Sequence, residues 1–260
     1  MPNEILNQNQ TEFFKNCGKI IAPLMFNFAY YVSETANNPI LISYRGAHPI
    51  KHALDHLNIE SKPLWLNRNV ARQLKKDIIK DYCEQQKLNE PFTFVDTGYL
   101  GTMPNLLKTD LPFKSDFQTI FLTHGYEFSN DITPFLCRNE KSNGKHITPF
   151  SFAALLDSLP GEYKAYGTQI FQYDDSGTVQ VCPCKKSRFE CNITKTFYAG
   201  MTEGYSMCDN NERKFRQYLN LLNDIKAKIY PGMDNMKLEL KEHEVEKIAE
   251  YSKQIERIFQ

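Results

Sequence analysis

The stretch that decides the fold is FTFVDTGYLGTMPNLL, residues 92–107. It begins with an apolar, strand-like run at 92–96, continues through a loop with two glycines, and ends in a helical pattern. A similar unit precedes it, because PILISY (39–44) is strand-like, breaks at 45–47 and is followed by a helix-like run at 50–57. We predict two more strands, PLWL and TIFLTH, at 63–66 and 119–124, and a polar helix from about 70 to 86. Strands that alternate with helices at this spacing predict an α/β fold, a Rossmann-like parallel sheet flanked by helices.

The segments on either side of this core are predicted to be mainly helical. Residues 1–34 form a helical segment that packs on the core, as one helix or as two around Pro23, and 35–132 form the α/β core itself. Residues 133–260 form an extension with a β-hairpin that turns at 175–177. Two amphipathic helices follow, with apolar stripes at 215–229, stopped by Pro231-Gly232, and at 245–259. We expect this extension to cover the sheet or a partner, including a second copy of the chain.

The composition is that of a soluble globular protein, and it excludes several classes of partner. The 260 residues are 41% hydrophobic and 24% charged, with 31 Lys and Arg against 31 Asp and Glu. A chain without a basic excess is a poor nucleic-acid binder. The longest apolar segment, Ile20–Val32, is too short for a bilayer and contains Pro23 and Asn27, so we expect no membrane span.

The seven cysteines indicate reduced thiols in the cytoplasm, because no secretory signal is recognised at the N-terminus. Four of them form a weak zinc candidate: Cys182, Cys184, Cys191 and Cys208. Their irregular spacing favours buried or incidental thiols. His48, His52 and His56 recur at four-residue intervals, but opposite the apolar face of their helix, so a solvated polar face is favoured over a metal site. His48 is kept as a possible site residue because it lies nearest the preceding turn.

The loop after the 92–96 strand is the strongest candidate for a phosphate site. Ligands of open α/β sheets bind at the carboxyl ends of strands, and the glycines here allow positive φ and close backbone approach. Amide groups at the start of the following helix would accept an anion. The predicted phosphate-binding residues are Thr97, Gly98, Tyr99, Leu100, Gly101 and Thr102. Asp96 would hold ribose hydroxyls or Mg²⁺ beside the phosphate, and Tyr99 could also stack on a base or sugar. The structural alternative is a tight turn capped by Thr102.

Two arginines follow the other predicted strands. Arg45 beside Gly46 can offer a fork of donors to a phosphate, and Arg68 follows the 63–66 strand. A surface arginine in a turn is the equally weighted alternative for Arg45. His124, at the end of the 119–124 strand, could line the same site or serve as a turn residue.

The order of these motifs resembles the core of type I phosphoribosyltransferases. The matching runs are ILISYRGAHPIKHALDHL, PLWLNR and FTFVDTGYLGTMPNLL. The resemblance implies that the Arg45-Gly46 loop contacts pyrophosphate and that the loop after Asp96 holds a phosphoribosyl group. The family has two adjacent acids at that position, whereas Asp96 is followed here by Thr97.

Residues 16–108 are also similar to an uncharacterised bacterial module that accompanies haloacid-dehalogenase-like hydrolases in surface-polysaccharide proteins. The positions that fit its pattern are Gly18, Pro23, Leu24, Arg45, Arg68, Asp96, Gly98, Gly101 and Thr102. Gly46 and Asn67 stand where that module has Asp and Ser. The chain also lacks the paired Asp-x-Asp that a dehalogenase-type phosphatase needs.

The leading functional hypothesis is an enzyme of the phosphoribosyltransferase type that acts on a phosphorylated sugar or nucleotide. In it Asp96 holds ribose or Mg²⁺, and Arg45 and Arg68 stabilise the charge of a departing phosphate. The alternatives are a non-catalytic module that binds a small phosphorylated ligand, an interaction protein that uses its C-terminal helices, and a phosphohydrolase.

Overall fold

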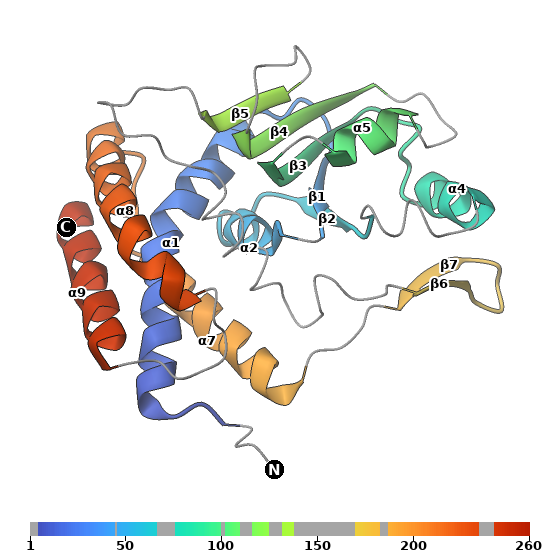
Figure 1. Cartoon of the computed structure of the whole chain (residues 1–260). Helices are drawn as coiled ribbons and strands as arrows, with labels where there is room; N and C mark the ends of the chain where they lie inside the picture. Colours follow the sequence, from blue (N-terminus) through green and yellow to red (C-terminus); the bar gives the residue numbers. More distant parts are fainter. Residues whose placement is uncertain are drawn as a thin grey trace.

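The computed structural model describes residues 5–44, 46–66, 76–99, 102–109, 116–124, 132–137, 170–182, 187–233 and 242–260. Its centre is a five-stranded sheet in which every pair of neighbouring strands is parallel (Figure 1). The strand order is β2-β1-β3-β4-β5, and the strands are β1 (Ile40–Ser43), β2 (Ser61–Leu64), β3 (Phe92–Tyr99), β4 (Phe117–His124) and β5 (Ile132–Cys137). The predicted Rossmann-like α/β class is therefore confirmed.

Helices cover both faces of the sheet, because the side chains of each strand point alternately to two separate hydrophobic clusters. In β1, Ile40 and Ile42 belong to one cluster and Leu41 belongs to the other. The first cluster contains residues of α1 (Gln8–Thr35) and α2 (His48–His56). The second contains residues of α4 (Lys76–Gln85) and α5 (Thr102–Thr109). The helices that follow β1 and β3 thus lie on opposite faces.

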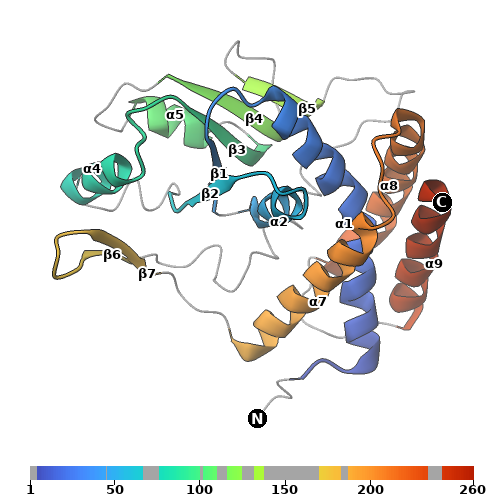
Figure 2. The ribbon, with the colours of Figure 1, turned by 180° about the vertical axis from the view of Figure 1, so that it is seen from behind.

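The long helix α1 packs closely against α7 (Arg188–Tyr205), which comes from the far end of the chain (Figure 2). Small residues make this close contact possible. A Cβ added to Gly200 would lie 1.9 Å from the Lys15 carbonyl oxygen, and one added to Gly18 would lie 2.0 Å from that of Phe197. The two backbones therefore touch where side chains would normally separate them. The pairs Gly18-x-x-x-Ala22 and Gly200-x-x-x-Gly204 are the sequence signal of this crossing.

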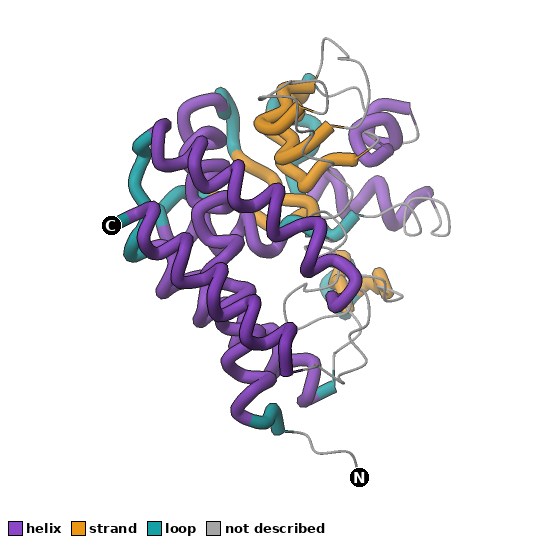
Figure 3. Tube along the Cα trace, turned by 60° about the vertical axis from the view of Figure 1, so that its left-hand side comes forward, coloured by secondary structure: helices purple, strands orange, loops and turns teal. Residues whose placement is uncertain are grey.

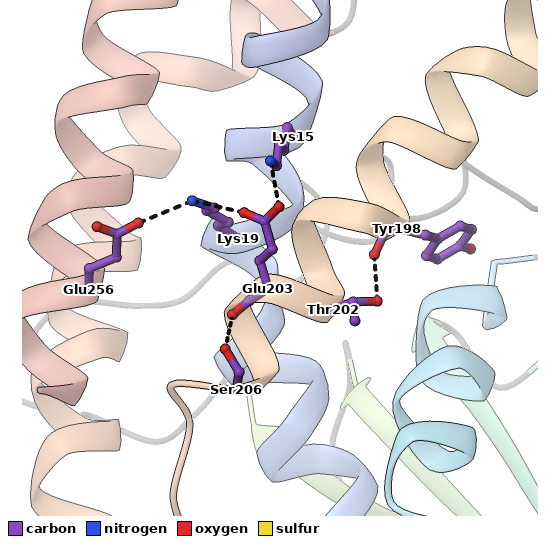
Figure 4. A network of polar contacts seen from close by, with 7 residues as sticks. All are labelled: Lys15, Lys19, Tyr198, Thr202, Glu203, Ser206 and Glu256. Atoms are coloured by element: carbon purple, nitrogen blue, oxygen red, sulfur yellow. Dashed lines mark hydrogen bonds and ion pairs between the residues drawn. The ribbon is translucent and has the colours of Figure 1, made fainter.

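Two further helices, α8 (Glu212–Met233) and α9 (Glu242–Phe259), complete a helical layer beside α1 (Figure 3). Polar contacts join three helices of this layer (Figure 4). Lys19 of α1 lies 3.2 Å from a Glu203 oxygen on α7 and 3.3 Å from a Glu256 oxygen on α9. Lys15 contacts Glu203 at 2.5 Å, and the two lysines lower the pKa of Glu203. The C-terminal helices are thus tied to the N-terminal helix by charge as well as by packing.

The predicted hairpin is confirmed and consists of β6 (Ile170–Tyr173) and β7 (Val179–Cys182). It packs on α4, where the Gln85 side chain donates to the Val179 carbonyl and accepts from the Val179 amide. Asp174 organises the turn by accepting from Ser176, Gln180 and Thr178, which lowers its pKa to about 2.

Several expectations about elements and their boundaries are wrong. The strand predicted at 63–66 lies at Ser61–Leu64. The strand at 92–96 continues to Tyr99, because β4 pairs with it as far as His124. Helix α8 continues through Pro231-Gly232 to Met233 instead of stopping there. A fifth strand, β5, was not expected, and Pro134 explains why: proline interrupts a strand pattern and is tolerated at the edge of a sheet, where β5 lies. Pro23, by contrast, lies inside an uninterrupted α1.

Among the helices of the described residues, none combines the length and the apolar character needed to cross a bilayer.

Candidate functional site

The strand order places one topological switch point in the sheet, between β1 and β3. The chain moves from β1 to β2 in one direction and then from β3 through β4 to β5 in the other. Pairing between β1 and β3 is recorded up to Ile42 and Val95, whereas β3 stays paired with β4 to Tyr99. Open α/β sheets bind ligands outside the carboxyl ends of the strands at such a point. Asp96 and the turn after Tyr44 are the two sequence features that lie beside it.

Asp96 is half-buried in the middle of β3, level with Ser43, the last residue of β1. Its Oδ1 atom accepts hydrogen bonds from the Thr97 amide at 2.8 Å and from the Thr97 hydroxyl at 3.3 Å. Thr97 is itself held in place, because its carbonyl accepts from the buried Thr123 hydroxyl of β4 at 3.0 Å. The carboxylate therefore has a fixed orientation on a central strand, as a binding group requires.

Gly98 has a positive φ of +104°, which a glycine allows, and the neighbouring strand is the reason for a glycine here. A Cβ at this position would lie 1.7 Å from the carbonyl oxygen of Thr123. The space next to the Gly98 backbone, where we expected a phosphate, is therefore occupied by the backbone of β4. Thr97, Gly98 and Tyr99 are strand residues and not members of a phosphate loop, which corrects their predicted placement.

Helix α5 begins at Thr102, so this residue is the first of the helix rather than the residue before it. Leu100 and Gly101, which join β3 to α5, lie outside the described residues. A helix follows the strand of Asp96 as expected, although three strand residues lie between Asp96 and the strand end. The amide groups in the first turn of α5 therefore lie at the carboxyl edge of the sheet.

Arg45 and Arg68 also lie outside the described residues, so their convergence with Asp96 stays a prediction. The strands that precede them, β1 and β2, are neighbours of each other, and β1 is also a neighbour of β3. Gly46 is buried and leads into α2, whose N-cap residue, Ala47, makes no side-chain capping hydrogen bond. Pro49, in the first turn of α2, has no amide hydrogen, so this turn has fewer donors for an anion than the first turn of α5.

The expected solvated histidine face of α2 is confirmed for His56, which is exposed, but not for His52, which is half-buried against α7. The His52 ring stacks on Tyr198 at a centroid distance of 4.7 Å, and its Nδ1 lies 3.4 Å from the Tyr205 hydroxyl. The His56 ring also contacts Tyr205. Burial lowers the pKa of His52, with Asp55 opposing and His56 reinforcing this shift. The aromatic residues of α7 are far away in the sequence and could not be assigned to this face in advance.

The four-thiolate zinc candidate is not supported by the positions of its members. Cys191 lies in the first turn of α7 and Cys208 lies beyond its last, so roughly 20 Å of helix separates them. Cys208 is half-buried, its thiol donates to the Gly204 carbonyl, and burial raises its pKa to about 12. Cys182 is exposed on β7, and Cys184 lies outside the described residues. In the described part of the chain, no three His, Cys, Asp or Glu side chains are grouped so as to hold a metal.

Two residues near the switch point were missed by the sequence reasoning. Tyr44 follows β1 and Trp65 follows β2, and their ring centroids are 3.6 Å apart. On the other side of Tyr44, the His48 ring lies at 3.8 Å. Aromatic residues directly after two neighbouring strands were the signal that could have indicated them. His124, the last residue of β4, pairs with Tyr99.

No protein-family model matches the chain, and no curated protein matches it either. The function must therefore be argued from the site itself.

Proposed function

We propose that this protein binds a small phosphorylated ligand, a sugar phosphate or a nucleotide, at the switch point between β1 and β3. The observation that supports it is that the fixed carboxylate of Asp96 and the start of α5, the helix that follows β3, lie beside the one point where strand order reverses. The amide groups and the arginines bind phosphate, and Asp96 binds ribose hydroxyls.

Mg²⁺ is compatible with this arrangement. The ion is commonly held in proteins by one or two carboxylates together with substrate phosphates, so a single Asp96 is sufficient when a phosphorylated ligand is bound. Bound there, Mg²⁺ would neutralise phosphate charge.

The reaction proposed for this site is transfer of a phosphoribosyl-type group, as the resemblance to type I phosphoribosyltransferases implies. Arg45 and Arg68 would then stabilise the negative charge on the departing pyrophosphate. Thr97 in place of a second acid favours the second candidate, a module that binds the same ligands without converting them.

The binding step is tested by calorimetry with ribose 5-phosphate, adenosine 5′-monophosphate and pyrophosphate, each with and without Mg²⁺. Asp96→Asn and Arg45→Ala should each weaken binding about tenfold or more, because each removes a charge-assisted contact. The matched controls are Asp175→Asn in the hairpin turn and Arg216→Ala on the exposed side of α8, which should bind as the wild type does. Unchanged affinity in both site variants would show that the phosphorylated ligand binds elsewhere.

The catalytic step is tested separately, by pyrophosphate release from phosphoribosyl pyrophosphate in the presence of a panel of bases. If the wild type releases pyrophosphate and Asp96→Asn does not, the transferase is supported. Binding without release across the panel supports the binding module.

A further inference from the structure

Three aromatic rings form a continuous row at the carboxyl edge of β1 and β2. Its members are Trp65, Tyr44 and His48, with Tyr44 in the middle, and we call this group the aromatic row. Each ring is half-buried, whereas Ser43 and Leu64, the last residues of the two strands, are buried. The aromatic row therefore lies between the buried core and the carboxyl edge of the sheet, where we propose the ligand binds.

The backbone beneath the row is held by hydrogen bonds. The Tyr44 amide donates to the Leu64 carbonyl at 2.9 Å, and the Trp65 amide donates to the Tyr82 hydroxyl at 3.0 Å. Because the rings also contact one another, little side-chain freedom remains to be lost when a ligand binds. Pre-organised aromatic surfaces of this kind favour binding of flat groups.

A buried hydroxyl lies close to the row. Tyr198 of α7 points toward α2, and its ring stacks on His52, one turn of α2 beyond His48 (Figure 4). Its hydroxyl is buried and has no hydrogen-bond partner among the described residues. Burial and the nearby Tyr44 raise its pKa, so this hydroxyl stays protonated and able to donate. A buried donor without a partner is costly, and a ligand atom that accepts from it would remove that cost.

The row is close to Asp96 along the edge of the sheet. Ile42 of β1 is level with Val95 of β3, so Tyr44 and Asp96 lie within two residues of the same level on adjacent strands. Adjacent strands are about 4.8 Å apart. By strand alternation the side chains of Tyr44 and Asp96 face opposite sides of the sheet, so a ligand lying across the carboxyl edge can reach both.

We propose that the aromatic row and the Tyr198 hydroxyl recognise the base of a nucleotide, whose ribose and phosphate lie toward Asp96 and α5. The inference rests on the proposed phospho-ligand site and narrows its ligand class from phosphorylated sugars in general to nucleotides. The base stacks along the row, and one of its nitrogen or oxygen atoms accepts from Tyr198.

Trp65 is the one tryptophan of the chain, so its fluorescence reports directly on the row. We would titrate the wild type with adenosine 5′-monophosphate, uridine 5′-monophosphate, adenosine and ribose 5-phosphate, and measure the same affinities by calorimetry. The nucleotides should bind at least tenfold more tightly than ribose 5-phosphate, and their binding should change Trp65 fluorescence, because stacking of a base on an aromatic ring contributes about that factor.

Three variants separate stacking from folding. Trp65→Ala should remove the advantage of nucleotides over ribose 5-phosphate while leaving ribose 5-phosphate binding within about threefold, whereas Trp65→Phe should keep most of the advantage. Tyr198→Phe should weaken nucleotide binding alone, since it removes the hydroxyl and keeps the ring. Tyr30→Ala, which removes an exposed aromatic ring on α1, is the matched control and should change nothing.

The outcomes distinguish this inference from the proposed function. Equal affinity for nucleotides and ribose 5-phosphate in the wild type overturns the base site and leaves the phosphate site standing. If adenosine binds as tightly as adenosine 5′-monophosphate, and Asp96→Asn changes neither affinity, the row is supported and the phosphate site is overturned. Failure of all four ligands to bind overturns both.

Discussion

At the scale of single residues, Gly98 shows how one sequence signal can have two physical causes. A glycine after a strand and an acid indicates either a ligand that approaches the backbone or a neighbour that does so. Here the neighbour is the Thr123 carbonyl of β4, and the positive φ belongs to a strand residue. Asp96 lies two residues earlier in β3 and differs from Gly98, because its hydrogen bonds from Thr97 orient a charged carboxylate.

Gly98→Ala is therefore expected to destabilise the protein by about 3 kcal/mol, through both the φ of +104° and the clash with β4. Chemical denaturation measures the loss. Gly177→Ala is the matched control, since its φ is +78° but a Cβ there meets nothing within 4 Å, and it should cost only about 1 kcal/mol. Equal losses in the two variants would show that β4 is not the constraint at Gly98.

At the scale of elements, the contact between α2 and α7 couples the site-bearing sheet to the helical layer. His52 of α2 is enclosed by Tyr198 and Tyr205 of α7, and burial holds its pKa below the ordinary value of 6.5. The folded state therefore keeps this ring neutral where the unfolded chain would already bind a proton.

This contact predicts a pH dependence of stability. As pH falls through 6.5 the unfolded chain takes up a proton at His52 and the folded chain does not, so stability falls, and this decline ends below the lowered pKa. His52→Phe keeps an aromatic ring for Tyr198 and should flatten the dependence of unfolding free energy on pH just below about 6.5. His243→Gln, exposed on α9, is the control and should leave the slope unchanged. A slope that persists in His52→Phe would assign it to other groups.

The small-residue contact of α1 with α7 and the hairpin contact on α4 are also element-scale features. The hairpin could be predicted, because its turn signal and flanking strands are local. The α1–α7 crossing could not be assigned from its glycines alone, since the two helices are separated by most of the chain.

At the scale of the whole molecule, one hydrophobic cluster joins the sheet to both ends of the chain. It contains Ile42 and Val95 from the strands and Ile248 and Phe259 from α9. The apolar stripe of α9 is thus largely buried within the chain. Lys247 and Arg257 are exposed and lie outside that stripe.

Removal of 242–260 should destabilise the whole protein by about 5 kcal/mol or more, because it takes away several buried large side chains and uncovers α1. That loss is comparable to the total stability of many domains, so we expect the truncated chain to unfold at much lower urea concentration or to lose its cooperative transition. Trp65 fluorescence and far-ultraviolet circular dichroism would follow the sheet edge and the helices separately. A truncated chain with the wild-type midpoint by both probes would mean that α9 does not support the core.

The sequence by itself determined the α/β class, four of the five strands and the hairpin, because these depend on periodicity and turn residues that are close together in the chain. It placed Asp96 at the end of its strand, whereas β3 continues to Tyr99. Only the tertiary structure decided the strand order and with it the switch point, since pairing between distant strands leaves no local pattern. The same holds for the packing of His52 against α7, the β4 contact at Gly98 and the row formed by Trp65, Tyr44 and His48, each of which depends on which other segment packs alongside.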